Sequence, residues 1–342
     1  MCKIKVFAVN SGDCISIKYK GTDGKYHNIF IDCGFARTFA STLEKEVIDI
    51  KSNGEKIDLF ILTHTHKDHI GGISEFIKKY GTDDIVDKYW FNGGRLLLNL
   101  DKSPKISINQ GYELEKYLIE NKNGNEDKIV FKRNNEYIFG AEICVIGPNE
   151  EVLNKFLSSW NKDYSILSEK ISTSLCDWGI DISDFNLETF DEDDCYDNKS
   201  SIVLLFAFNN KKILLLGDSA PSEVVKSLKS LGYSKENRLK LEYLKVSHHA
   251  SRGNTSNELL EIIDCNKFII STNGANSYKF PHKETFARIL RHELRDINKK
   301  IEFIFNYDTK EIRSIFKESD YEKFNFECIY PMRGENFSEI SI

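Results

Sequence analysis

The chain of 342 residues lacks any long apolar run. A helix that spans a bilayer needs about 20 consecutive apolar residues, so this absence argues against a membrane-embedded protein. The first residues, Met1 to Val6, alternate like a strand and lack the pattern of a signal peptide. We therefore expect a cytoplasmic protein with no membrane partner.

The sequence also lacks cysteine pairs of the C-x-x-C type, although it contains eight cysteines. This absence argues against a zinc ribbon. Several cysteines, such as Cys144 and Cys328, fall inside apolar runs. We interpret them as reduced thiols in the core of the protein.

Positive charge is not in excess, because the net charge is −6. Proteins that grip long duplex DNA usually present a basic surface. The acidity is concentrated between Asp177 and Asp197, and lysine is abundant elsewhere. This balance weakens the case for a nuclease acting on long duplexes and leaves room for a small phosphoester substrate.

Histidine is scarce, yet three of the eight histidines lie between Thr63 and Gly72. This segment follows the apolar run Leu59 to Leu62, which is typical of a buried strand. A loop after such a strand places its polar side chains at one sheet edge. Imidazole nitrogen and carboxylate oxygen are ligands for zinc, iron or manganese. The alternative is an ordinary polar surface loop. The ligand candidates here are His64, His66, Asp68 and His69.

Two later apolar runs also end in residues of this kind. The run that ends at Leu216 is followed by Gly217 and Asp218, and the run that ends at Val246 is followed by His248 and His249. Taken alone, Asp218 is equally consistent with a turn residue or a helix N-cap.

The order of these motifs resembles the metallo-β-lactamase superfamily. The resemblance implies an α/β fold of the αββα type, in which two sheets are packed between outer helices. It implies that Asp218 bridges two ions and that Asp32 and Asp13 orient ligands from behind the site. For the last ligand we favour His248, the first to leave its strand, over His249. The implied metal ligands are His64, His66, Asp68, His69, Asp218 and His248.

A narrower resemblance is to the hydrolase domain of the ComEC family and its free-standing relatives. It runs from about residue 3 to about residue 317 and does not include that family's membrane channel, so we do not expect DNA transport by this chain alone. It rests on short motifs in the same order, namely Gly12-Asp13-Cys14, Asn198-Lys199-Ser200-Ser201, Lys245-Val246-Ser247-His248-His249-Ala250-Ser251 and Ser271-Thr272-Asn273-Gly274-Ala275-Asn276-Ser277-Tyr278.

The sequence departs from these patterns in informative places. Many superfamily hydrolases have one more ligand histidine, but this chain has no histidine between His69 and His248. The ion expected on His64, His66 and Asp218 would then lack a ligand or take one from another residue type. Two smaller departures are Ala250, where related motifs have glycine, and the order Pro281-His282.

We expect a metal-dependent hydrolase, most simply a phosphodiesterase or nuclease that uses a metal-bound hydroxide. The cofactor would be Zn²⁺, as one or two ions, with Mn²⁺ or Fe as alternatives. The substrate would be a phosphoester or a nucleic acid. The alternatives are a hydrolase of lactones, thioesters or amides, and a degenerate relative without activity.

Several residues are assigned roles in this chemistry. Asp68 and His249 are expected to be catalytic, as is Lys245, which could instead cover its strand end with its aliphatic stem. Substrate contacts are expected from three residues of a later loop, Asn276, Tyr278 and His282.

The domain organisation follows from the same patterns. We expect one hydrolase domain over residues 1–317, with a helical or irregular insertion at about 150–198. This insertion would form a cap near the active-site edge or, alternatively, a surface excursion away from substrate. The last strand of the domain is expected at 312–316, and residues 318–342 are expected to pack on it as an extension.

Overall fold

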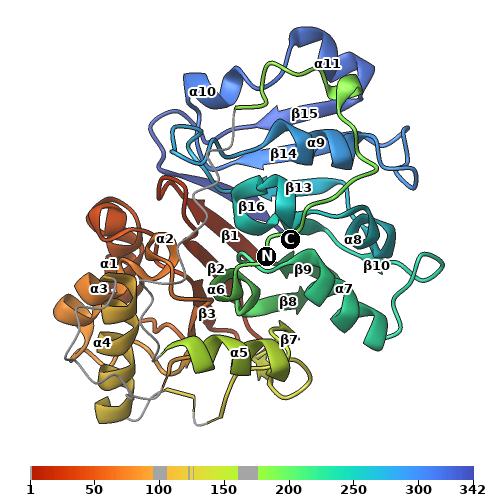
Figure 1. Ribbon diagram of the computed structural model, residues 1–342. Coiled ribbons are helices and arrows are strands. Elements are labelled where there is room, and N and C mark those ends of the chain that lie inside the picture. The colour runs from red at the N-terminus through yellow and green to blue at the C-terminus, as the bar shows by residue number, and fades with distance from the viewer. Residues whose placement is uncertain (1, 95–105, 122–123, 126, 161–175) are drawn as a thin grey trace.

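The computed structural model describes residues 2–94, 106–121, 124–125, 127–160 and 176–342 (Figure 1). Two β-sheets form its interior. The first has six strands in the order β16-β1-β2-β3-β4-β5, and β3, β4 and β5 run parallel. Its strands are β1 (Cys2–Phe7), β2 (Ile15–Lys20), β3 (Tyr26–Ile31), β4 (Leu59–Leu62), β5 (Tyr89–Phe91) and β16 (Phe337–Ser341).

The second sheet has eight strands in the order β15-β14-β13-β11-β9-β8-β7-β6, and it runs parallel from β9 through β15. Its strands are β6 (Asn135–Ile138), β7 (Ala141–Gly147), β8 (Val203–Phe208), β9 (Lys211–Leu215), β11 (Tyr243–Lys245), β13 (Lys267–Ile270), β14 (Ile301–Phe305) and β15 (Phe326–Ile329). A separate pair consists of β10 (Leu239–Lys240) and β12 (Ile263–Asp264).

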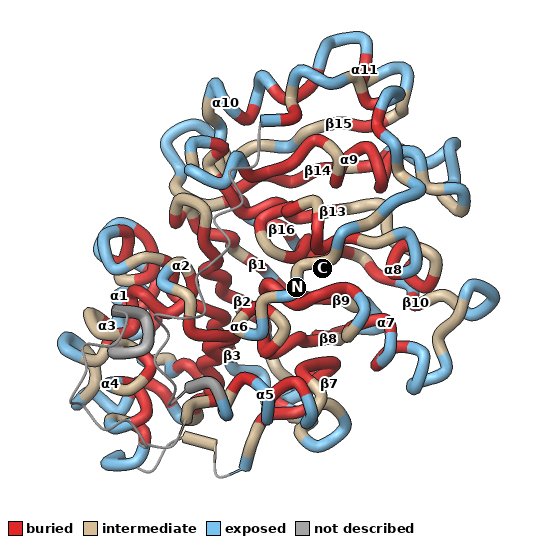
Figure 2. The backbone as a smooth tube through the Cα atoms, in the orientation of Figure 1, coloured by how far each residue is buried: buried red, intermediate tan, exposed pale blue. Residues whose placement is uncertain are grey.

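Alternating side chains pack the two sheets against each other. Ile17 and Ile61 of the first sheet belong to the same apolar cluster as Leu204 and Ile213 of the second. Burial of each such side chain stabilises the fold by roughly 1.5–3 kcal/mol. Figure 2 shows these strands as the buried interior and the connecting loops as the exposed periphery.

Helices cover the outer face of each sheet (Figure 1). One outer cluster joins the first sheet to α1 (Leu43–Ser52), α3 (Ile73–Tyr80), α4 (Ile106–Asn121) and α5 (Glu150–Trp160). Another joins the second sheet to α7 (Pro221–Ser230), α8 (Asn257–Ile262) and α9 (Lys283–Leu290). The predicted αββα arrangement is confirmed.

The remaining elements are short. They are α2 (Lys67–Ile70), α6 (Tyr196–Lys199), α10 (Lys310–Arg313), α11 (Glu318–Lys323), η1 (Ala36–Ser41), η2 (Ile182–Asp184), η3 (Ser247–Ala250) and η4 (Arg252–Asn254). Within the described ranges, no helix has both the length and the apolar character that crossing a membrane requires.

The C-terminal residues belong to both sheets. β15 pairs in parallel with β14, and β16 pairs antiparallel with β1, so the segment expected as a packed extension supplies a strand to each sheet. The strand predicted at 312–316 is wrong. The Thr309 side chain accepts a hydrogen bond from the backbone N–H of Ile312 and caps α10 there.

The insertion expected at about 150–198 is described on both sides of residues 161–175, which lie outside the described part of the chain. The η2 turn in its second half contacts α9. Asp177 accepts hydrogen bonds from the backbone N–H groups of Lys283 (2.9 Å) and Glu284 (3.0 Å) and so caps α9. The segment ends in α6.

Candidate metal centre

The candidate ligands meet where strands of both sheets end. The backbone N–H of Ile202 donates to Thr63 O (3.0 Å), which joins the start of β8 to the loop after β4. The backbone N–H of His248 donates to Gly217 O (3.0 Å), which joins the loops after β9 and β11. These contacts place the polar residues that follow three strands around one point.

Asp32, one residue beyond β3, holds the histidine loop from behind. Its Oδ1 accepts a hydrogen bond from the backbone N–H of Thr63 (2.7 Å), and its Oδ2 accepts from the Thr63 hydroxyl (2.8 Å). Oδ2 also lies 2.7 Å from Nδ1 of His69. Since a carboxylate on Nδ1 fixes the ring and leaves Nε2 to bind a metal, Asp32 orients His69.

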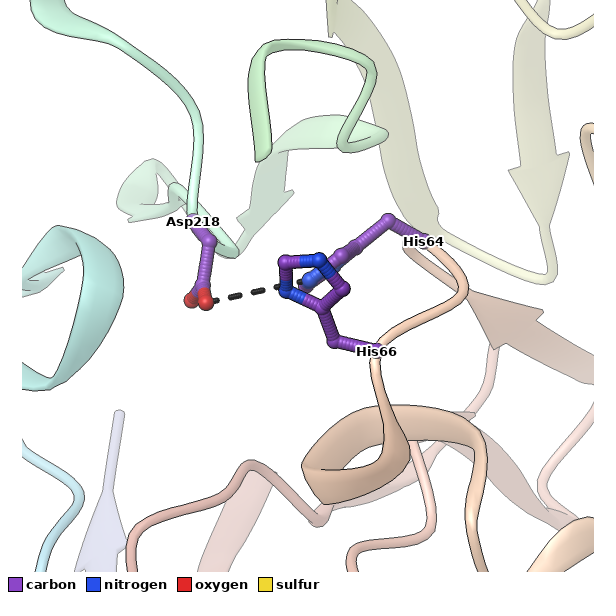
Figure 3. Close-up of side chains that lie close together, drawn as sticks. All are labelled: His64, His66 and Asp218. Atoms are coloured by element: carbon purple, nitrogen blue, oxygen red, sulfur yellow. Dashed lines mark ion pairs between the residues drawn. The ribbon is translucent and has the colours of Figure 1, made fainter. Parts of the chain in front are cut away.

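The first ligand group consists of His64, His66 and Asp218 (Figure 3). One ligand atom from each lies within 4.8 Å of the others. His64 Nε2 is 3.8 Å from Asp218 Oδ2. The rings of both histidines and the carboxylate point towards a common space.

A second group consists of Asp68, His69 and His249, whose ligand atoms again lie within 4.8 Å of one another. His249 Nε2 is 3.3 Å from Asp68 Oδ2. Asp218 Oδ2 lies 3.2 Å from His69 Nε2 and 3.7 Å from His249 Nε2. Asp218 therefore stands between the two groups, where one carboxylate could serve both.

The fit of these residues to metal ions can be judged from their unsatisfied atoms. Buried polar atoms in proteins almost always have a hydrogen-bond partner. Among the described residues, four buried atoms of the two groups have none, and they are Nε2 of His64, His69 and His249 and Oδ1 of Asp218. The three Nε2 atoms lie within 3.8 Å of Asp218 Oδ2, which is the convergence of ligand atoms that a centre for divalent cations requires.

The surrounding charges set the protonation of these groups. Burial, with the neighbouring His69 ring, lowers the pKa of His64 well below its ordinary value, so its lone pair is available. Burial also acts to lower the pKa of His69, but the Asp218 and Asp32 carboxylates outweigh it and hold that pKa well above its ordinary value. Metal binding at His69 must therefore release a proton.

Part of this chain matches a known protein family. Residues 23–116, which include β3, β4 and the whole histidine loop, match the family described as the metallo-beta-lactamase superfamily. Over these residues the chain is similar to the metallo-β-lactamase superfamily. The histidine loop described above lies entirely within the matched residues.

Two curated proteins are similar in sequence to this chain. Recombination protein 2 of Haemophilus influenzae is 26% identical over 229 residues, which are 65% of this chain and 26% of that protein. ComE operon protein 3 of Bacillus subtilis is 30% identical over 101 residues, which are 29% of this chain and 12% of that protein. The chain thus matches only a minor part of either relative.

Solved structures are similar at a lower level. A CmlA beta-hydroxylase mutant aligns over 100% of this chain and 54% of its own, with 11% identity and a TM-score of 0.43. A diphosphatase from the PhnP family aligns over 83% and 90% of the two chains, with 13% identity and a TM-score of 0.37.

The two adjacent histidines after β11 occupy different positions at the candidate metal centre. His249 is buried, and its Nδ1 lies 2.9 Å from the carbonyl O of Ser271, which leaves Nε2 for a metal. His248 Nδ1 lies 3.1 Å from both Asp193 Oδ2 and Asn254 Oδ1, and its ring is 20% exposed. The geometry therefore favours His249 as the ligand, against our preference for His248, which lies at the rim.

The backbone explains why this pair is hard to assign. His248, His249 and Ala250 have φ values of 46°, 54° and 64°, a left-handed run that is strained for residues other than glycine. Strand alternation ends before this run and does not extend through it. The glycine of related motifs would adopt the conformation of Ala250 without strain.

Lys245 lies in the interior of the protein. It is 1% exposed and forms an ion pair with Asp13, which is itself 2% exposed. Its Nζ also donates to Gly217 O (3.1 Å). This burial and pairing favour a structural role for Lys245 over the expected catalytic one.

Asp13 lies behind two candidate ligands. Its Oδ1 is 3.7 Å from His249 Nδ1, and its Oδ2 is 3.9 Å from His69 Nδ1. The preceding residue must be small, because a Cβ on Gly12 would lie 2.1 Å from the carbonyl O of Asp68. The Gly12-Asp13 motif thus lets the N-terminal loop press against the histidine loop.

The three expected substrate contacts are spread over different environments. Asn276 holds its own turn, since Oδ1 accepts from the backbone N–H of Phe280 (2.9 Å) and Nδ2 donates to Phe280 O (2.8 Å). His282 is buried, and its Nδ1 accepts from the backbone N–H of Arg252 (3.0 Å). Tyr278 is 41% exposed and stacks on Phe280. Tyr278 alone is well exposed for contact with a ligand.

Sequence reasoning did not assign a role to Asp193. Its Oδ2 accepts a hydrogen bond from Asn198 Nδ2 (2.6 Å) besides its contact with His248. Its backbone N–H donates to Gly253 O (3.0 Å), which fastens the acidic segment to the loop after β11. The available signal was the concentration of acidic residues directly before a motif that belongs to the site.

Replacing His249 with alanine is expected to remove about one equivalent of zinc per chain, because the second group loses a buried ligand. His248→Ala is the matched control, since it deletes the adjacent imidazole at the rim, and it should retain the zinc of the unmodified protein. Elemental analysis after dialysis against zinc-free buffer measures both. Loss of zinc from His248→Ala, with retention in His249→Ala, would reverse the assignment.

Proposed function

We propose that the metallo-β-lactamase domain is a metal-dependent phosphodiesterase that acts on small phosphoesters and short single strands. The observation that carries this proposal is the convergence of buried, unsatisfied ligand atoms from two groups that share Asp218. When bound, a pair of divalent ions lowers the pKa of a water and neutralises charge that develops on phosphoryl oxygens.

The residues divide this work between them. His64, His66 and Asp218 would hold one ion. Asp68, His69 and His249 would hold the other, with Asp218 shared. The partly exposed Asp68 carboxylate is also placed to orient the attacking water.

His248 is placed to act on the substrate itself. Its ring is held by Asp193 and Asn254 through Nδ1, and its Nε2 lies 3.8 Å from Asp218 Oδ2. An oriented, partly exposed imidazole at this position can donate a hydrogen bond to a phosphoryl oxygen or pass a proton to a leaving group. This supports an anionic substrate over a neutral lactone or amide.

The acidic segment supports a small substrate. Asp193 is bound to the loop after β11, while Asp191 and Asp194 are exposed beside it. Exposed carboxylates at the rim repel a long polyanion, whereas a short anion is exposed to less of this repulsion.

A substrate series tests the proposal. We expect turnover to fall from bis(p-nitrophenyl) phosphate and a dinucleotide, through a single-stranded oligonucleotide, to a plasmid, with the plasmid at least about tenfold slower than the dinucleotide because of this repulsion. The protein is assayed at one concentration with Zn²⁺ and with Mn²⁺. The Asp218→Ala variant, purified in parallel, reports contaminating nucleases.

The other outcomes are equally informative. Efficient plasmid cleavage at ~150 mM salt would contradict the size limit, since weak contacts to phosphates do not survive such salt. Failure of the metal-loaded protein on all four substrates, with hydrolysis of a lactone or thioester, would replace the phosphodiesterase by the non-phosphate hydrolase.

A further inference from the structure

The first ligand group has two histidines of its own, and its third member, Asp218, also lies against the second group. A structural or catalytic zinc ion usually has four ligands, and a catalytic site leaves one of them to water or substrate. His64, His66 and Asp218 supply three. The chain has no histidine between His69 and His248 that could stand beside them.

A second set of ligand atoms adjoins this group through His66. Ligand atoms of His66, Cys195 and Asp197 lie within 4.8 Å of one another. Two ligands at about 2.0–2.2 Å from one ion are at most about 4.4 Å apart. His66 is the residue common to both sets, so the Asp197 carboxylate would have to move towards His64 and Asp218 to join an ion that His66 holds.

The segment that carries Cys195 and Asp197 is fixed in place. The backbone N–H of Cys195 donates to Asp193 Oδ1 (3.0 Å). The Ser200 hydroxyl donates to the carbonyl O of Asp197 (2.7 Å), and the backbone N–H of Lys199 donates to Cys195 O (2.9 Å). These bonds fix the local conformation at the start of α6, and Asp193 in turn contacts His248 Nδ1 through its Oδ2 (3.1 Å).

Independent evidence for an ion at this point comes from His64. Its Nε2 is buried and has no hydrogen-bond partner among the described residues, and it faces Asp218. Its Nδ1 lies 3.1 Å from the Thr63 hydroxyl and 3.3 Å from the Ser201 hydroxyl, which orient the ring. An oriented ring with an unsatisfied inner nitrogen is the arrangement of a metal ligand.

Between the two new candidates, the carboxylate is the better ligand. Cys195 Sγ lies 3.9 Å from Asp197 Oδ2 in donor geometry, so the thiol supports the carboxylate from one side. A carboxylate is ionised at neutral pH without assistance, whereas an ordinary thiol is mostly protonated. Thiols next to hydrolytic metal ions are also less common than oxygen or imidazole ligands.

We propose that the Asp197 carboxylate is the fourth protein ligand of the ion held by His64, His66 and Asp218, in place of a histidine. Compared with a site that has a third histidine at this position, such a centre has one more negative charge and one more oxygen ligand. Since carboxylates favour harder cations, the first position should accept Mn²⁺ more readily than a three-histidine site does.

The test is a calorimetric titration of chelator-treated protein with Zn²⁺ and with Mn²⁺, which reads metal binding and does not depend on the bond that is hydrolysed. Asp197→Asn should weaken one of two binding events by at least about tenfold and leave the other unchanged. Asp194→Asn is the matched control, because it removes the same charge from an exposed position in the same segment, and it should bind as the unmodified protein does. Cys195→Ser should also bind normally.

One further variant and two spectroscopic measurements complete the design. Asp197→His should restore the affinity for Zn²⁺ and lower the preference for Mn²⁺, and circular dichroism of every variant shows whether the fold is retained. Equal affinities for Asp197→Asn and Asp194→Asn would overturn the proposal. So would a thiolate-to-cobalt charge-transfer band in the Co²⁺ protein that disappears in Cys195→Ser.

Discussion

Replacing Asp218 with alanine is expected to remove both metal ions and to reduce hydrolysis by a factor on the order of 10³, since each ion contributes separately to the reaction. The carboxylate belongs to the first ligand group and also lies against two histidines of the second. Its Oδ2 lies 3.8 Å from His64 Nε2, 3.2 Å from His69 Nε2 and 3.7 Å from His249 Nε2. Its removal therefore takes a ligand from each ion at once.

The measurement combines elemental analysis with turnover of bis(p-nitrophenyl) phosphate. Asp191→Ala, an acidic residue that is exposed, controls for the loss of charge alone and should keep its metal and its activity. A full complement of metal in Asp218→Ala would show that the two groups bind their ions independently. Loss of only one ion would assign Asp218 to a single group.

A second large effect is expected in stability. Lys245→Met should lower the free energy of unfolding by about 3–5 kcal/mol, because it leaves the buried Asp13 carboxylate without its partner. Both side chains are almost completely buried, and Lys245 also bonds to Gly217 O. Urea unfolding of the metal-free protein measures the change without a contribution from bound ions.

The neighbouring strand offers a control for this variant. Lys267 pairs with Glu242 at 3.0 Å, but both side chains are partly exposed, so Lys267→Met should cost less than about 1 kcal/mol. Adding Asp13→Asn to Lys245→Met should recover part of the loss. Unchanged stability of Lys245→Met, together with a large drop in turnover, would return Lys245 to a catalytic role.

The sequence identified the regions of the centre because the strands that lead into it have simple patterns. Every residue of β4, Leu59 to Leu62, is buried, and a run of that kind between two parallel neighbours predicts where the next loop must lie. Ile213 to Leu215, the buried end of β9, indicate the position of Asp218 in a similar way. Once the ends of these strands are placed, the approximate position of the ligands follows.

Finer assignments depended on features that sequence patterns do not contain. The choice between His248 and His249 depends on the left-handed turn at 248–250, through which strand alternation cannot be extended. The burial of Lys245 depends on Asp13, which is distant in sequence. Ile312 to Phe316 has the apolar spacing of a short strand, but the cap at Thr309 directs the chain into a helix first.

The pairing of β1 with β16 has a consequence for how the chain reaches this structure. During synthesis β1 is made long before its partner at Phe337–Ser341, so one edge of the first sheet stays open until β16 has been made. An open edge can pair with another chain and start aggregation. β1 carries Lys3 and Lys5 at its less buried positions, and charged side chains of this kind discourage such pairing. Lys3 and Lys5 therefore discourage pairing of the open β1 edge with another chain until β16 has been made.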